Sequence, residues 1–125
     1  MFFSKIAAGI LLLPFMTPSA FAMDEEQAKK FDRIANLSMP QLTEEAGKAL
    51  QDKYPNEDWS VYDFPQFVYT SDSTEIAYKI AVKEPELLSS IVCYCFCERF
   101  GHESLLYCFF EEGKAGGEFD AHGSR

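Results

Sequence analysis

The chain has little positive charge. It carries 11 lysines and arginines against 20 aspartates and glutamates, for a formal net charge of −9, and no block of basic residues interrupts this balance. Nucleic acids and anionic lipid surfaces are bound mainly through clustered basic residues, so the composition argues against both kinds of partner. An acidic surface suits cations, but most acidic surfaces only keep a protein soluble.

The chain also lacks an apolar run long enough to predict a membrane anchor. The run at residues 6–15 holds about ten residues, against the roughly 20 that a membrane-spanning helix needs. Lys5 precedes it and the small residues Ala20 and Ala22 follow it, which is the order of a cleavable secretory signal peptide. We therefore predict that residues 1–22 are a signal peptide, removed on export, and that no stable membrane anchor remains.

The motifs of several common activities are missing too. The sequence has no Ser–His–Asp order, no glycine-rich phosphate loop, no HExxH pair and no EF-hand loop, so hydrolase, kinase-like and calcium-sensor functions have no support. No two cysteines are separated by two residues, which excludes a thioredoxin-type CxxC and a haem-attaching CxxCH. Any cysteine chemistry must use a different arrangement.

The mature chain, residues 23–125, has a length that supports one domain with one modest core. Its periodicity is mainly helical: apolar residues recur at helical spacing over residues 24–37, and Ser38 starts a second helix with the capping-box partner Gln41. Both helices are expected to pack on the core. Residues 59–69 are aromatic and too irregular for a helix, so we expect them to form a flap over the core.

Two later segments complete the expected fold. A helix capped by Asp72 is predicted to end at Pro85, with a short turn at residues 86–91 after it, and a fourth short helix is expected around Leu105 and Cys108. The sequence therefore predicts a small, mostly α-helical single domain of about four short helices, with little strand. A cysteine-rich connection joins the last two helices.

The cysteines form one tight cluster, with Cys93, Cys95 and Cys97 alternating and Cys108 following. An extended segment would place the first three sulfurs on one face and turn Val92 and the intervening aromatic residues toward the core. A helical segment would instead turn Cys95 away from the other two. In both cases Cys108 is the natural outside partner, and the four cysteines allow three disulfide pairings that sequence cannot choose among.

The remaining soft donors in the chain are His102 and His122. Thiolates with imidazole favour copper, zinc or iron–sulfur centres, and a chain exported unfolded cannot easily carry a cluster assembled in the cytoplasm. We therefore predict an exported protein that binds copper or zinc. The candidate metal ligands are Cys93, Cys95, Cys97, His102, Cys108 and His122.

Two other functions stay open. In a thiol redox protein, one of the four cysteines would attack a disulfide partner protein and a neighbour would resolve the mixed disulfide, with His102 lowering the pKa of the attacker. The other alternative is an interaction domain held by two structural disulfides. We prefer metal binding without enzyme activity, because three alternating cysteines exceed the two that a simple redox pair needs. The oligomeric state is not predicted.

The C-terminal part of the chain resembles the CYCXC proteins of bacteria, which are related to proteins with a PCYCGC motif. The resemblance rests on residues 85–88, 93–97, 101–105, 108–109 and 120–122. It implies a small protein of the bacterial periplasm or extracellular space, with a cysteine and histidine site that contains selenocysteine in some members. It implies no known reaction, although selenocysteine in relatives favours the redox alternative.

The sequence departs from this family in two places. Val92 stands where many relatives have proline. Relatives similar to this chain also continue into another Cys-x-x-Cys pair, whose first cysteine would fall just after Arg125. We therefore expect either a reading frame closed early, as a fragment or at a UGA codon meant for selenocysteine, or a naturally shorter member of the family.

Overall fold

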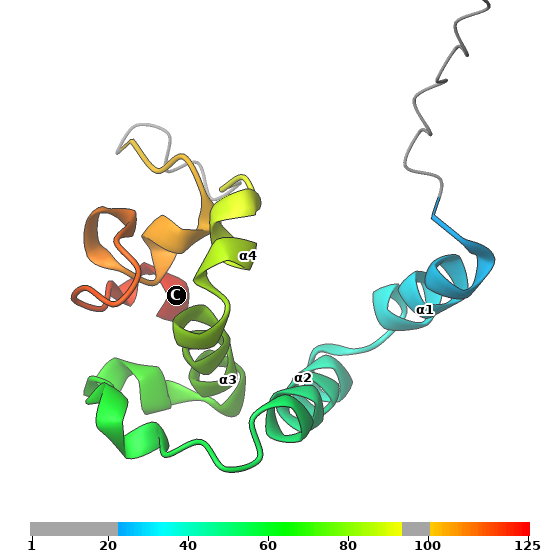
Figure 1. The fold of residues 1–125 in the computed structure, drawn as a ribbon, viewed down its shortest axis with the longest axis horizontal. Helices are drawn as coiled ribbons and strands as arrows, with labels where there is room; N and C mark the ends of the chain where they lie inside the picture. Colours follow the sequence, from blue (N-terminus) through cyan, green and yellow to red (C-terminus); the bar gives the residue numbers. More distant parts are fainter. Residues whose placement is uncertain (1–22, 94–100) are drawn as a thin grey trace, which may run out of the picture.

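The computed structural model describes residues 23–93 and 101–125, and these residues form a small, mostly helical domain (Figure 1). Its α-helices are α1 (Glu25–Ala35), α2 (Met39–Lys53), α3 (Asp72–Lys83) and α4 (Pro85–Ser90). Short 3₁₀ turns separate and follow them: η1 (Trp59–Tyr62), η2 (Gln66–Thr70), η4 (Leu105–Cys108), η5 (Glu111–Gly113) and η6 (Ala121–Ser124). Within the two described ranges, β pairing is confined to the isolated bridges Val92–Ser104 and Phe110–Phe119. The predicted fold class is confirmed, while the signal peptide at residues 1–22 lies outside the described residues.

In the part of the chain that the structure describes, no helix has both the length and the apolar character needed to cross a bilayer.

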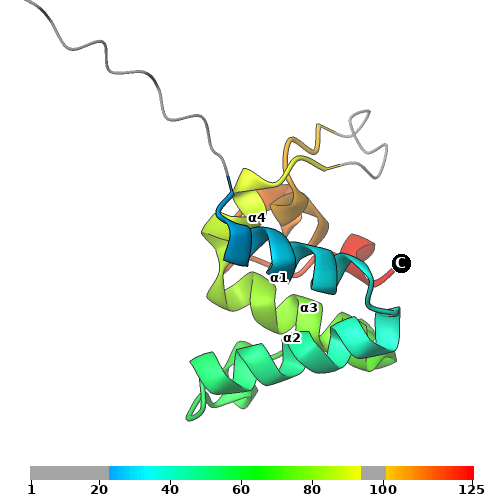
Figure 2. The same ribbon diagram turned by 90° about the vertical axis from the view of Figure 1, so that its right-hand side faces the viewer.

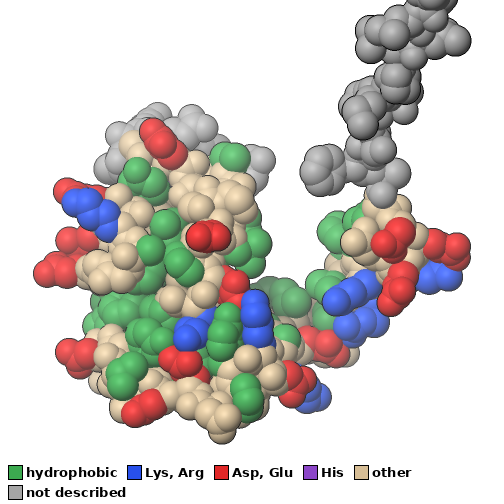
Figure 3. Space-filling model, in the orientation of Figure 1, with side chains coloured by type: hydrophobic (Ala, Val, Ile, Leu, Met, Phe, Trp, Pro, Cys, Tyr) green, Lys and Arg blue, Asp and Glu red, His purple; other side chains and the backbone are tan. Residues whose placement is uncertain are grey.

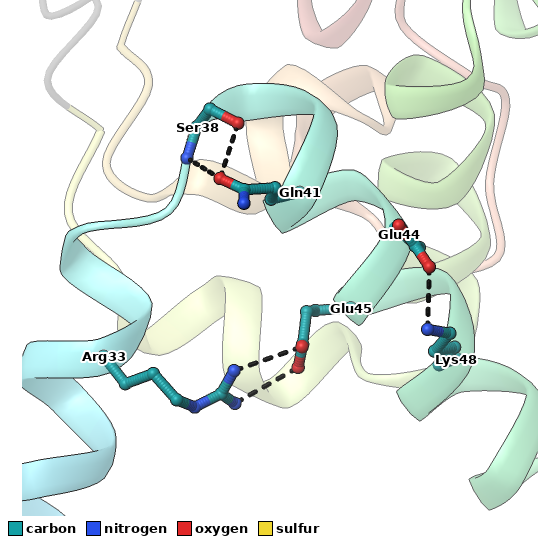
Figure 4. A network of polar contacts seen from close by, with 6 residues as sticks. All are labelled: Arg33, Ser38, Gln41, Glu44, Glu45 and Lys48. Carbon is teal, nitrogen blue, oxygen red and sulfur yellow. Dashed lines mark hydrogen bonds and ion pairs between the residues drawn. The ribbon is translucent and has the colours of Figure 1, made fainter.

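Side-chain caps define the starts of the longer helices. The predicted capping box of α2 is confirmed, because the Gln41 side-chain oxygen accepts from the Ser38 backbone N–H at 3.0 Å (Figure 4). The start of α3 differs from the prediction by one residue. Ser71 is the cap rather than Asp72, and its hydroxyl oxygen accepts from the Thr74 N–H at 3.2 Å. These bonds satisfy N–H groups that the first turn of a helix leaves without intrahelical partners.

The fourth α-helix is α4, in a segment where the sequence predicted only a turn. Pro85 occupies its first turn, where the fixed φ of proline favours a helix and its missing N–H costs nothing. The helix expected around Leu105 is the 3₁₀ turn η4 instead. Ser104 and Phe110 on either side belong to β-bridges, so the segment between them is too short for a regular α-helix.

Helix α3 lies at the centre of the core. It packs against α2, η2, α4 and η6, and its Tyr78 side chain is completely buried. The Tyr78 ring contacts the rings of Phe67, Phe109 and Phe119 at centroid distances of 5.7, 4.9 and 6.0 Å. The aromatic segment at residues 59–69 covers this core as predicted, through buried and partly buried side chains of η1 and η2.

Helix α1 does not pack on the core, which corrects the prediction for its apolar face. None of its residues is buried, and Phe31 and Ile34 are 60% and 37% exposed. Figure 1 shows α1 standing away from α3 and α4, and in Figure 2, viewed from that side, α1 lies in front of them. Figure 3 shows hydrophobic side chains at the surface among the charged ones. Arg33 joins α1 to α2 through two hydrogen bonds of 3.1 Å to Glu45 (Figure 4). The elements α2, η2, α4 and η6 already pack around α3, so the core does not need α1 to cover it.

We predict that the stability of the domain depends on α4 and hardly on the apolar face of α1. Leu88→Ala removes a side chain that is 4% exposed and should lower the free energy of unfolding by about 2 kcal/mol or more. Phe31→Ser, on the exposed face of α1, should change it by less than about 0.5 kcal/mol. Urea unfolding of both variants measures the difference, and equal losses would show that α1 is packed in solution.

Candidate metal centre

Cys93 and Cys108 meet in the core although they lie in different segments. The backbone bridge between Val92 and Ser104 and a 2.8 Å hydrogen bond from Leu105 N–H to the Ile91 carbonyl align these segments. The two sulfurs lie 3.7 Å apart, and the cysteines are 4% and 6% exposed. A disulfide would hold the sulfurs about 2.05 Å apart, so the pair is present as thiols.

At the start of the cysteine cluster, Val92 and Cys93 point in the directions opposite to those predicted for an extended segment. Val92 is 55% exposed and Cys93 is buried, whereas the extended arrangement was expected to turn Val92 into the core. A thiol is small and packs as an apolar group, and here the Cys93 side chain belongs to the core cluster. The candidate ligands Cys95 and Cys97 lie outside the described residues.

His102 joins the two cysteines. One ligand atom from each of Cys93, His102 and Cys108 lies within 4.8 Å of the other two. The His102 ring stacks on Tyr107 at a centroid distance of 5.4 Å, and its Nδ1 atom is shielded from solvent. Gly101, just before it, has a φ of 74°, a conformation that glycine adopts without steric cost.

His122 approaches the same group from the C-terminal turn η6. Its ring centroid lies 5.4 Å from that of His102, with the two planes at 80°. Its Nδ1 atom is 3.4 Å from a side-chain oxygen of Asp120, which also accepts a 2.7 Å hydrogen bond from the His122 N–H. His122 does not belong to the group of three whose ligand atoms all lie within 4.8 Å, but it borders that group.

Gly123 allows the C-terminal turn to come this close. A Cβ atom at this position would lie 2.8 Å from the Phe109 ring and 2.9 Å from the Cys108 carbonyl oxygen. Such contacts are too short for a side chain, so only glycine fits. The absence of a side chain at Gly123 therefore lets the turn that carries His122 lie against Phe109 and the Cys108 backbone.

Tyr78 and Asp120 support the site from the core, and the sequence did not identify either residue as part of it. The Tyr78 hydroxyl donates a hydrogen bond to the Asp120 backbone carbonyl. Burial raises the pKa of Tyr78 to about 12, and the negative charge of Asp120 adds to this effect. The hydroxyl therefore stays protonated at neutral pH. Nothing in the sequence pointed to this role for Tyr78, because the apolar pattern of its helix predicted other residues as the buried ones.

The arrangement offers two sulfur donors and one imidazole to a single point, which is a donor set for a metal ion. A cleft of about 470 Å³, lined by Val92, Cys93, Gly101, His102 and Glu103, borders this group. An ion can therefore reach the site although both thiols are buried. The three donors come from separate stretches of the chain, so their convergence is a result of the tertiary fold.

Comparison with protein families places this chain in a family known from its sequence motif. A family described as proteins of unknown function with a PCYCGC motif matches residues 32–125. The motif corresponds to residues 92–97, where Val92 and Phe96 replace its proline and glycine and the three cysteines are kept. Comparison with curated proteins and with solved structures gave no significant match.

We predict that Tyr78 contributes a pH-dependent part of the stability. The native state holds the phenolic proton up to about pH 12 and an unfolded tyrosine only up to its ordinary pKa of 10.0. This contribution is complete below pH 10 and falls as the pH rises toward 12, by about 2 kcal/mol. The Tyr78→Phe variant has no hydroxyl to titrate at this position, so it should not lose this part of the stability at alkaline pH.

Urea unfolding at a series of pH values from 8 to about 11.5 tests this prediction. Tyr78→Phe should be less stable than the wild type at pH 8, because the Asp120 carbonyl loses its donor. The gap between the two proteins should narrow above about pH 10. The other tyrosines titrate in both proteins and cancel in the difference, so a constant gap would contradict the assignment.

Proposed function

We propose, from the premise that this chain belongs to the family of proteins of unknown function with a PCYCGC motif, that it binds one copper or zinc ion. The ligands that the described residues offer are Cys93, His102 and Cys108. The observation that carries the proposal is the convergence of their ligand atoms within 4.8 Å of one another. Cys95 and Cys97 remain candidate ligands from the sequence.

The spacing of the two sulfurs supports this proposal. Two thiolates bound to one tetrahedral ion through bonds of about 2.3 Å lie about 3.8 Å apart. The Cys93 and Cys108 sulfurs are already 3.7 Å apart, so both can bind one ion with little movement of the chain. Sulfur and imidazole donors together favour copper and zinc over magnesium or calcium, which prefer oxygen ligands.

The short distance between the sulfurs also favours a second candidate, a thiol redox protein. In that reaction the thiols of Cys93 and Cys108 would form a disulfide, giving two electrons and two protons to an external disulfide that becomes two thiols. Attack on such a partner requires an accessible sulfur, and these cysteines are only 4% and 6% exposed. A single ion needs far less space, so we prefer metal binding.

We also propose that the protein acts outside the cytoplasm, after cleavage of the signal peptide. The basis is the sequence of residues 1–22, with its lysine, apolar run and small residues. Thiols outside the cytoplasm are oxidised unless they are protected, and burial together with a bound ion would protect this pair. Mass spectrometry of the exported protein should find Met23 as its first residue, and an intact residue 1–22 segment would contradict the proposal.

We predict that the reduced mature protein binds one Co²⁺, used as a spectroscopic substitute for zinc, and that both described cysteines are required. The wild type should show the near-ultraviolet charge-transfer absorption of cobalt–thiolate bonds. Cys93→Ser and Cys108→Ser should each weaken this absorption and lower the affinity by at least about tenfold, because each variant removes one ligand. Titration with Co²⁺, followed by competition with Zn²⁺ and Cu⁺, measures the change.

Ser89→Ala serves as the matched control and should leave binding unchanged, because the exposed Ser89 hydroxyl donates to the nearby Glu86 carbonyl. Bound metal should also stabilise the fold, by about 2.7 kcal/mol at a metal concentration 100 times the dissociation constant. Absence of thiolate charge transfer in the reduced wild type, with recovery of a Cys93–Cys108 disulfide from the native protein, would reject metal binding in favour of the redox function.

A further inference from the structure

We infer that His122 is the fourth ligand of this metal centre and that Asp120 holds its ring in the binding orientation. The inference rests on the proposed metal-binding function. It completes a Cys₂His₂ coordination shell, whose fourth ligand comes from η6 at the C-terminal end of the described residues. A tetrahedral ion held by Cys93, His102 and Cys108 alone would leave one position for another ligand.

The relation between the two histidine rings supports this inference. Two imidazoles bound to one tetrahedral ion through bonds of about 2.0 Å have ring centroids about 5 Å apart. The centroids of His102 and His122 are 5.4 Å apart, so their spacing already fits two ligands of the same ion. The Tyr107 ring, by contrast, stacks on that of His102 with the two planes at 27°. The His122 ring lies at 80° instead.

The His122 ring must still move to reach the group of three, because it lies outside that group. The His122 side chain is 40% exposed, so its ring can turn toward the cysteine pair without displacing core residues. The turn that carries it already lies against the Cys108 backbone, because Gly123 has no side chain to prevent the contact. The proposal therefore requires rotation about the side-chain bonds of His122 and no displacement of the backbone of this turn.

Asp120 determines which ring nitrogen faces the metal. Its carboxylate lies 3.4 Å from Nδ1 of His122, close enough to tighten to a hydrogen bond when the ring turns. A carboxylate that accepts from one ring nitrogen fixes the tautomer and leaves the other nitrogen, Nε2, as the metal ligand. The Asp120 backbone is in turn held by the hydroxyl of the buried Tyr78, so the carboxylate is anchored to α3.

A closed shell would decide the class of function. Sites with three protein ligands and one open position bind and activate water or a substrate, whereas four protein ligands serve structure, storage or delivery. With His122 in place, the ion would have no open position for a reacting molecule. The centre would then hold or hand over the ion and would not catalyse hydrolysis.

The experiment compares Co²⁺ binding by the wild type, His122→Ala and Asp120→Asn, with Ser124→Ala as the control. Ser124 lies in the same turn, and its hydroxyl donates to the Ala121 carbonyl. His122→Ala should lower the affinity by about 100-fold and Asp120→Asn by about tenfold, since ligand-orienting residues contribute 10–100-fold. Asp120→Asn keeps an oxygen that can accept from the His122 N–H, so the turn itself is preserved. Ser124→Ala should bind as the wild type does.

Proton NMR of the Co²⁺ protein supplies a readout that a purely structural role would not change. Coordinated imidazoles show strongly shifted, exchangeable N–H signals, so the wild type should show two and His122→Ala one. Circular dichroism and urea unfolding of the metal-free proteins establish that the variants fold. Two shifted signals in His122→Ala, or an affinity equal to that of the wild type, would overturn the inference and leave the proposed metal binding intact. A reduced wild type that binds no Co²⁺ would reject both.

Discussion

The side chain of Tyr78 connects the helical core to the cysteine and histidine cluster. Its ring packs against Phe109, the residue after Cys108, at a centroid distance of 4.9 Å, and its hydroxyl holds the backbone of Asp120. A single residue of α3 therefore fixes two segments that contribute to the site. Because the residue is fully buried and its pKa is raised to about 12, it remains a neutral hydrogen-bond donor at any physiological pH.

Burial of two thiols so close together has an electrostatic consequence. If both ionised, charges 3.7 Å apart would repel each other by about 4 kcal/mol at an effective dielectric constant of 20. This repulsion disfavours two thiolates side by side in the metal-free pair, and cysteine packs in protein cores as a small apolar group. A bound cation removes this repulsion, and the thiols release their protons as it binds. The same pair can thus serve as core residues without metal and as ligands with it.

The sequence predicted the features that depend on local interactions. Helical periodicity located α2 and α3, and the spacing of Ser38 and Gln41 located the start of α2, because caps and amphipathic patterns involve residues a few positions apart. It did not predict that α1 would stay outside the core, that Val92 would face outward, or that Tyr78 would reach Asp120. These depend on which surfaces other elements occupy, and no local pattern encodes that information. Cys108 was expected to be the outside partner of the cluster, because neither an extended nor a helical segment makes its three cysteines equivalent, and it lies beside Cys93. The position of His122, in contrast, depends on Gly123.

The distribution of regular structure explains why a metal centre would suit this domain. The described residues after α4 form only 3₁₀ turns and two isolated bridges, and such segments have few cooperative backbone hydrogen bonds with which to stabilise themselves. Cys93, His102 and Cys108 belong to this part, and an ion bound by all three would cross-link its separate stretches. Because the unfolded chain offers no preformed site, the free energy of binding would contribute directly to folding. The core around Tyr78 already joins the two parts, because Leu106, Phe109 and Phe110 of the C-terminal part are buried in it beside Ala81 and Leu88 of the helices. A bound ion would add a second connection within the C-terminal part.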